Sequence, residues 1–333
     1  MLQYIIRRVI GFLPLLFAVS IIAFVLIELP PGDFLTTYVQ RLEDFTATKL
    51  SPAEVENLTR FYGLDKPFYV RYAKWIGNIV LRRNFGWSLT FSRPVNEIIG
   101  DPMITAVALS LLALALTYVI AVPVGIISAV RQYSWFDYTF TFLGFIGLAV
   151  PSFLLALLVL WFSFRYLGVA ITGLFSPDFI DAPWSVARVG DLLKRVWAPV
   201  IIVAVSGVAA LIRVLRGSLL DELSKQYVVS ARAKGVSETR LLFRYPVRIA
   251  VNPIISGIGW VLPAIVSGQT VTAIVLNLQT TGPILFHALL SQDMYLAGSI
   301  VLILSSLVLV GNLISDILLA WIDPRIQFGG VGE

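Results

Sequence analysis

Few residue types in this chain could take part in chemistry, and their spacing argues against a catalytic centre. The 333 residues include no cysteine and a single histidine, His287. Disulfides, thiolate catalysis and cysteine metal sites are therefore excluded, and a histidine cluster cannot form. The sequence has no carboxylate pair, metal-ligand spacing or serine–histidine–aspartate set, and no Gly-Lys-Ser/Thr, the end of a phosphate-binding loop. It predicts neither an enzyme nor a bound cofactor.

The most informative polar region is a basic stretch that runs from Arg213 to Pro253. Residues 218 to 233 have a helical pattern that ends just before Gly235, and glycine is common directly after a helix end. Ala231 and Gly235 are four residues apart, so they share one face on which another backbone could approach closely.

A second short helix is predicted to follow in the same stretch. Ser237 has the character of an N-cap, and Glu238 would lie in the first turn. Two short helices outside a hydrophobic region are ill suited to catalysis. They suit docking into a groove on a partner protein.

The elements that must position this stretch are apolar to a degree that only a membrane explains. Hydrophobic residues make up 58% of the chain and charged residues 14%, against roughly 45–50% and about 25% in soluble domains. The net charge of +5 does not indicate a nucleic-acid partner, because the basic residues lie at the ends of apolar runs, where membrane orientation uses them. The lipid bilayer is the predicted surrounding.

Six apolar stretches approach or exceed the roughly 20 residues that a transmembrane helix needs, and each is predicted to be such a helix. The fold class expected is an all-α polytopic membrane helix bundle. The first stretch follows a short basic N-terminus without a convincing cleavage site, so it is predicted to be an uncleaved signal anchor. The stretches are residues 9–29, 105–130, 138–164, 197–212, 251–276 and 297–321.

The apolar stretches divide the chain into three parts: an N-terminal helix at 1–29, a polar segment at 30–101 and a core at 102–333. The core holds a loop at 214–250, which we call the coupling segment. Ser51 followed by Pro52 predicts a helix start in the polar segment. Its aromatic residues predict a compact cap at the membrane surface rather than disorder.

Lysine and arginine in the short loops predict the orientation. If the chain has six helices, then Arg7, Arg131, Arg325 and the basic residues of the coupling segment all fall on one side of the membrane. The positive-inside rule places that side, and both termini, in the cytoplasm. The 30–101 segment is then extracytoplasmic.

Four motifs, in order along the chain, resemble one family. One is the run Tyr227-Val-Val-Ser-Ala-Arg-Ala-Lys-Gly235, which is similar to the cytoplasmic "EAA" loop of binding-protein-dependent ABC importers. Its last five residues, Ala-Arg-Ala-Lys-Gly, resemble the sequence found in the dipeptide and oligopeptide permease branch. Leu29-Pro-Pro-Gly-Asp33, Asn252-Pro253 and the C-terminal run from Asn312 to Arg325 are similar to further signatures of that branch.

The chain departs from the family pattern at three places. Val229 occupies the glutamate position of the loop, Ala273 replaces a glutamate of the fifth helix, and Gln279-Thr280 replaces a Pro-Gly. The last two lie near the outer end of the expected pathway, so they bear on the identity of the substrate rather than on transport itself.

The resemblance implies a mechanism in which the coupling segment forms a helix seated in a cleft of an ATPase subunit. It implies docking by Ala231 and Gly235, with Arg232 and Lys234 supplying positive charge; the alternative for the two cations is ordinary inside-positive anchoring. Without a phosphate-binding loop in this chain, ATP hydrolysis would occur on another polypeptide. The implied partners are a second permease subunit, ATP-binding ABC subunits and an extracytoplasmic solute-binding protein, in a bacterial or archaeal plasma membrane.

The fifth helix lines the translocation pathway in the family that this chain resembles, which makes Gln269, Thr270 and Thr272 candidate pathway residues. The alternative for them is hydrogen bonding between helices, worth about 0.6 kcal/mol on average in a membrane. The cargo implied is short peptides. Oligosaccharides, nickel chelates or another solute stay open as alternatives, and so do an ion-driven secondary transporter and a passive scaffold protein.

Overall fold

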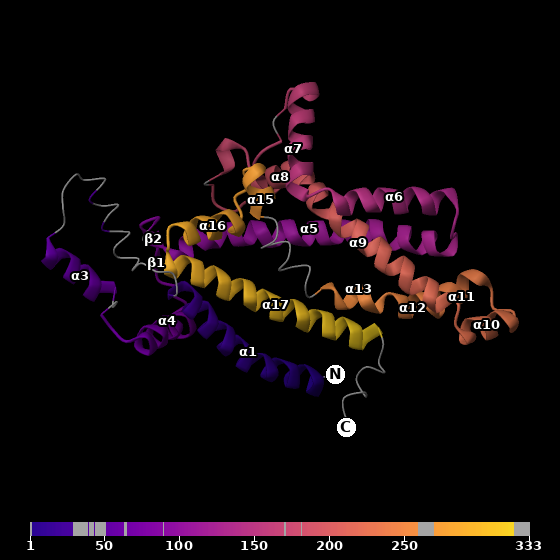
Figure 1. Ribbon diagram of the computed structural model, residues 1–333, viewed down its shortest axis with the longest axis horizontal. Coiled ribbons are helices and arrows are strands. Elements are labelled where there is room, and N and C mark those ends of the chain that lie inside the picture. The colour runs from indigo at the N-terminus through magenta and orange to yellow at the C-terminus, as the bar shows by residue number, and fades with distance from the viewer. Residues whose placement is uncertain are drawn as a thin grey trace. The chain divides into compact units, whose positions relative to one another are not determined.

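The computed structural model describes residues 2–28, 39, 43, 51–62, 65–88, 90–169, 171–180, 182–258 and 270–322. These residues are mostly helical, and they include one β-hairpin whose two strands have two residues each (Figure 1). The expectation of an all-α membrane fold is confirmed. The elements are α1 (Leu2–Glu28), α3 (Pro52–Tyr62), α4 (Phe68–Arg82), β1 (Trp87–Ser88), β2 (Arg93–Pro94), α5 (Val95–Val130), α6 (Trp135–Ala149), α7 (Ser152–Phe162), a π-helical turn (Ser163–Leu167), a 3₁₀ turn (Pro177–Phe179), α8 (Val186–Arg195), α9 (Trp197–Leu223), α10 (Gln226–Ala233), α11 (Glu238–Arg244), α12 (Pro246–Ala250), α13 (Asn252–Ser256), α15 (Thr270–Val275), α16 (Thr281–Leu290) and α17 (Met294–Ile322).

Four helices among the described residues are long and apolar enough to cross a bilayer: α1, α5, α9 and α17. A fifth crossing is possible if α6 and the helical stretch after it count as one span. The four long helices coincide with the expected stretches at 9–29, 105–130, 197–212 and 297–321. All four begin or end beyond the expected stretches, most clearly α5, which already begins at Val95, and α9, which continues to Leu223.

The expected single helix over 138–164 is wrong. It is broken between α6 and α7, whose axes differ by 100°. Pro151 has no backbone N–H and disfavours helical geometry at the residue before it. Val150 accordingly has φ −86° and ψ 118°, which is extended backbone. Apolar composition predicted the length of this stretch and not its bend.

The stretch expected at 251–276 is only partly described, because residues 259–269 lie outside the described residues. At its start the chain does not form one continuous helix but the short helices α12 and α13, which begin at Pro246 and Asn252. A tyrosine with φ −120° and ψ −80° precedes the first of them. The far end of the stretch is α15.

The described residues form two compact units, and the first comprises residues within 1–9, 105–279 and 307–333. Its core is arranged along α9, where Ile202, Leu215 and Leu219 are fully buried. Small residues let neighbouring helices approach α9 closely. A Cβ added to Gly147 of α6 would lie 3.2 Å from Val205, and one added to Gly207 would lie 3.2 Å from the Thr117 hydroxyl of α5.

The second unit comprises residues within 10–104 and 280–306. Its helix α3 begins as the sequence predicts, with a capping box. Ser51 Oγ accepts a hydrogen bond from the Glu54 amide at 3.3 Å, and a Glu54 carboxylate oxygen accepts one from the Ser51 amide at 2.8 Å. Next along the chain, α4 packs Tyr72 and Trp75 against Phe24 of α1.

A buried carboxylate, Asp293, joins the β1–β2 hairpin to the start of α17. It accepts hydrogen bonds from the Ser88 hydroxyl at 2.6 Å, from the Thr90 amide at 3.1 Å and from the Leu296 amide at 3.2 Å. The last of these is the N-cap bond of α17. Asp293 is 205 residues away from Ser88 in the sequence, so no local pattern indicated this contact.

We expect Asp293→Ala to lower the free energy of unfolding by about 2–3 kcal/mol, because it removes the cap and leaves the buried Ser88 hydroxyl without its acceptor. Thermal unfolding of the purified protein measures this loss. Asp293→Asn retains an acceptor oxygen and should lose less. Equal losses for the two variants would contradict the hydrogen-bonding role of the carboxylate.

Candidate coupling surface

The coupling segment begins with a break that the sequence pattern did not indicate. The expected continuous helix over 218–233 is wrong, because α9 ends at Leu223 and α10 begins at Gln226. Between them Lys225 is extended, with φ −74° and ψ 147°, and serves as the N-cap position of α10. The Ser224 hydroxyl donates to the Asp221 carbonyl at 2.8 Å, a local bond of the kind that competes with helix continuation.

A buried carboxylate holds the two sides of this break together. Glu222, at the end of α9, accepts hydrogen bonds from Lys225 Nζ at 2.5 Å and from the Tyr227 hydroxyl at 2.5 Å. Burial and the neighbouring carboxylate raise the pKa of Tyr227, so its phenol stays protonated and continues to donate. The angle at which α10 leaves α9 is thereby fixed.

The C-terminus of α10 confirms the helix end expected before Gly235. Gly235 has φ +77°, a left-handed conformation that favours glycine. Its amide donates to the Arg232 carbonyl at 3.0 Å, and the Val236 amide donates to the Ala231 carbonyl at 3.3 Å. Together these bonds form a Schellman motif.

The second short helix, α11, is also confirmed, with Ser237 at its N-cap position. The Ser237 side chain makes no capping bond. Glu238 pairs instead with Arg232 of α10, through contacts of 2.5 and 3.0 Å. The Arg232 guanidinium lowers the pKa of Glu238, and the carboxylate raises that of Arg232. This pair joins the two helices on their exposed side.

The four predicted docking residues lie together in the last turn of α10 and directly after it. Ala231 is half-buried, whereas Arg232, Lys234 and Gly235 are exposed. One face of the two helices packs inward, through the fully buried Val228 and Leu241. Around the docking candidates, the outward face therefore consists mainly of backbone, cations and small residues.

Two apolar side chains, Val229 and Phe243, are exposed on the same pair of helices and were not predicted as contact residues. The sequence does contain a signal for both residues. Each is an apolar residue within one helical turn of an arginine, Arg232 for Val229 and Arg244 for Phe243. Exposed apolar side chains in such surroundings indicate a surface that a partner covers.

The base of the coupling segment is tied to α6 by a buried ion pair. Arg216 of α9 donates to both carboxylate oxygens of Asp137, at 2.7 and 2.8 Å. The Asp137 side chain is 3% exposed and that of Arg216 is 25% exposed. The Tyr133 amide also donates to Asp137, at 3.0 Å. A bidentate pair of this kind has a defined geometry.

The candidate pathway residues are only partly described. Gln269 lies outside the described residues. Thr272 is buried, and its hydroxyl is 2.9 Å from the Ser152 hydroxyl of α7. Thr270 begins α15 and is half-buried. For Thr272, this geometry is that of a hydrogen bond between helices.

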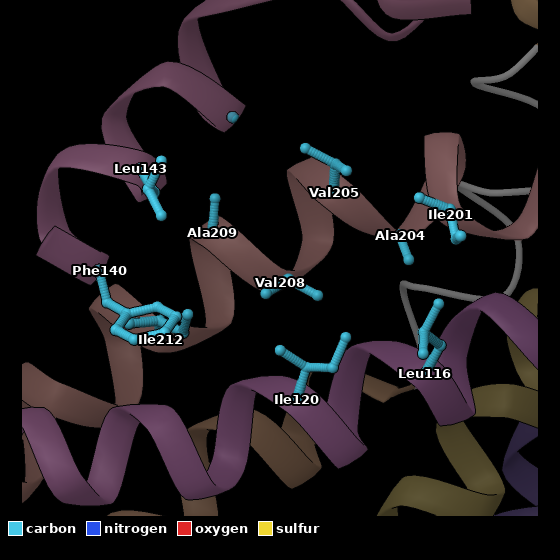
Figure 2. Close-up of a pocket in the computed structure, with 12 residues that line it drawn as sticks. Leu116, Ile120, Phe140, Leu143, Ile201, Ala204, Val205, Val208, Ala209 and Ile212 are labelled. Carbon is cyan, nitrogen blue, oxygen red and sulfur yellow. The ribbon is translucent and has the colours of Figure 1, made fainter. Parts of the chain in front are cut away.

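A cavity of about 420 Å³ lies between α5, α6 and α9, and Figure 2 shows its lining. The described residues that line it are all apolar or glycine, among them Leu116 and Ile120 of α5, Phe140 and Leu143 of α6, and Ile201 of α9. No candidate residue within the described ranges lines it. Its lining suits hydrocarbon and offers no side-chain partner for a peptide group.

Comparison with known proteins agrees with these features. Residues 121–328 match the family described as the binding-protein-dependent transport system inner membrane component, and residues 1–110 match the N-terminal part described for such membrane components. The membrane component is part of a transporter and not an enzyme.

Curated relatives cover the chain almost completely. The oligopeptide transport system permease protein AppB of Bacillus subtilis is 34% identical over 98% of this chain and 100% of its own length. A putative peptide permease protein of Brucella suis is 33% identical over 98% and 99%. The dipeptide transport system permease protein DppB of Alkalihalophilus pseudofirmus is 26% identical over 98% and 100%.

Among solved structures, one from the MetNI methionine ABC transporter in inward-facing conformations has a TM-score of 0.53 and 14% identity, covering 68% of this chain and 96% of that one. This likeness concerns the fold alone. The matched family regions, the full-length relatives and the apolar helices lead to one conclusion: this chain is a multi-pass inner-membrane protein that belongs to the family of binding-protein-dependent transport system inner membrane components.

Proposed function

We propose that this chain is the channel-forming permease subunit of an ATP-driven importer of short peptides. The observation that carries the proposal is its full-length similarity, at 34% identity, to a permease named for oligopeptide transport. The other relatives reported above are named for peptide and dipeptide transport. These names do not favour the alternative cargoes, oligosaccharides and nickel chelates, or an ion-driven transporter.

Energy would come from a separate subunit. The chain has no Gly-Lys-Ser/Thr with which to hold a nucleotide phosphate. We place ATP hydrolysis on ABC subunits that bind the coupling segment, residues 214–250. The last turn of α10 is exposed and is followed by Gly235 in a left-handed conformation, which supports docking of the ATPase at this turn.

The four candidate residues have different roles in this proposal. Ala231 and Gly235 allow the ATPase surface to approach the backbone of α10. Lys234 supplies positive charge toward the partner. Arg232 is paired with Glu238, so its main contribution is to hold α10 and α11 as one body, and its charge is partly compensated.

The remaining partners follow from the family. We propose a second permease subunit beside this chain, an extracytoplasmic solute-binding protein that delivers the cargo, and both termini in the cytoplasm. The 30–101 segment then lies on the side of the binding protein. The distribution of lysine and arginine supports this orientation.

The translocation pathway would be lined in part by Gln269, Thr270 and Thr272. For Thr272 the bond to Ser152 favours a structural contribution, because it ties α15 to α7. Thr270, half-buried at the start of α15, is the stronger candidate of the two described residues.

Site-directed cross-linking tests the docking of the coupling segment. The chain has no cysteine, so a single Ser230→Cys substitution gives one attachment point for a thiol-directed photoreactive reagent. In inner membranes we expect this position to cross-link to an ABC ATPase subunit, identified by mass spectrometry. Val186→Cys, at a side chain that is 93% exposed on α8, is the control and should not. Absence of the ATPase from the Ser230→Cys product, or the same product from both positions, would contradict the proposal.

A further inference from the structure

The second compact unit contains a cavity in which all the charged side chains among the described residues are cationic. Its volume is about 220 Å³, and it is lined mainly by residues of α4, with Arg60 from the end of α3; both helices are labelled in Figure 1. The polar side chains that line it include Arg60, Lys66, Arg71, Lys74, Asn78 and Asn84. No aspartate or glutamate lines it among the described residues. A cavity of this kind selects for an anion.

Arg60, Lys66 and Lys74 are not held by buried ion pairs, so an external anion can compete for them. Arg60 pairs with Glu56 at 2.6 Å and Lys66 with Asp65 at 3.0 Å, and all four of these side chains are substantially exposed. Exposed pairs are weak and exchange readily with a competing anion. Lys74 has no acidic partner in the part of the chain that the structure describes.

A buried donor in the lining gives an independent indication of a ligand. Trp75 is 4% exposed, and its indole Nε1 has no hydrogen-bond partner within the described ranges. The indole N–H can only donate, and buried donors normally have an acceptor. The ring is fixed by contacts with Phe24 and Tyr72. An oxygen atom held in the cavity would supply the acceptor.

The position of the cavity along the chain indicates which anion. Phe24 lies near the C-terminal end of the apolar span Arg8–Val25, and it contacts Phe68, Tyr72 and Trp75 of α4. Phe68 and Trp75 of α4 therefore lie at the end of a membrane span, the level at which aromatic belts and lipid headgroups occur.

The outer surface of α4 is suited to an amphiphile. Tyr69, Val80 and Leu81 are highly exposed and apolar, so acyl chains can cover them. Lys74 and Arg71, on the same helix, line the cavity. A lysine beside apolar surface at this level can form a charge-assisted hydrogen bond with a lipid phosphate.

We propose that this cavity binds the phosphate group of an anionic phospholipid. Lys74 pairs with a phosphate oxygen, and the Trp75 N–H donates to another. The acyl chains lie along the exposed face of α4. The chemistry recognised is a phosphate anion, and the apolar surface beside it makes the lipid headgroup, rather than free phosphate, the source.

The test is a lipid-binding measurement that does not depend on transport. Native mass spectrometry of the full chain in detergent gives the apparent affinity for phosphatidylglycerol and for phosphatidylcholine with the same acyl chains. We expect phosphatidylglycerol to be favoured by about fivefold or more, as one cation near a lipid surface would give. Lys74→Gln should remove this preference.

Two further variants separate the cavity from general surface charge. Arg82→Gln changes the same charge on the same helix outside the cavity lining, and it should keep the preference. Trp75→Phe preserves the ring and removes the N–H, so it should weaken phosphatidylglycerol binding without a change of charge. Equal loss in Lys74→Gln and Arg82→Gln, or no loss in Lys74→Gln, would overturn the site.

A competition arm separates the two sources of phosphate. Inorganic phosphate should not displace phosphatidylglycerol at equal concentration, because it lacks the acyl chains that α4 would hold. Displacement at equal concentration would overturn the lipid assignment. Because neither readout involves ATP or a peptide, these outcomes are independent of the proposed transport function.

Discussion

Replacing Gly235 with valine should abolish the stimulation of ATPase activity by cargo-loaded binding protein, while the chain still inserts and assembles. Gly235 has φ +77°, and a β-branched residue in that conformation is strained by on the order of 1–3 kcal/mol. No atom lies within 4 Å of a Cβ built at this position. The strain therefore acts through the backbone of the Schellman motif and not through a clash. Reconstituted transport and ATPase assays measure the loss.

Two variants control for general destabilisation. Gly168, after the π-helical turn, has φ +68° and equally open space around a built Cβ, so Gly168→Val introduces the same strain outside the coupling segment. Gly235→Asn adds a side chain that tolerates the left-handed region. We expect both variants to retain coupling better than Gly235→Val. Equal loss in both valine variants would show that the effect is not specific to the coupling segment.

Replacing Arg216 with methionine should destabilise the protein by about 2–4 kcal/mol. Removing one partner of a buried ion pair leaves an uncompensated charge, which is costly. Asp137 would be left 3% exposed, and its Tyr133 amide donor would be its main remaining compensation. We place the effect toward the lower end because Arg216 is 25% exposed and water can reach the site. Thermal unfolding of the purified complex measures it.

A double variant and a surface control make this prediction specific. Asp137→Asn combined with Arg216→Met removes both charges and should recover part of the loss. Arg232→Ala breaks an exposed pair with Glu238 and should change thermal stability little. A loss from Arg232→Ala as large as that from Arg216→Met would contradict the importance that we assign to burial.

Local signals in the sequence predicted local structure well. The glycine at 235 predicted the end of α10, and serine at 51 followed by proline at 52 predicted the start of α3. Each depends on residues within one helical turn, so a linear pattern contains the whole interaction. Of the six predicted spans, four are present as continuous helices, because hydrophobic length is itself a linear property.

Features that depend on distant residues or on backbone direction were not predictable in this way. Asp137 and Arg216 are 79 residues apart, and nothing in either neighbourhood indicates the other. The break at Ser224–Lys225 lies within an unbroken helical pattern, and it depends on the Glu222 cluster. The candidate docking residues lie together mainly because they are consecutive in sequence, so their proximity adds no independent support for their role.

The bend between α6 and α7 has a consequence for the bilayer around this chain. At 1.5 Å per residue, the 15 residues of α6 extend only about 22 Å, whereas the hydrocarbon core is roughly 30 Å thick. Neither leg of a 100° bend reaches across alone. The lipids beside it must thin locally or yield their place to a neighbouring subunit. Acyl-chain length is therefore a physical variable to which this part of the protein should respond.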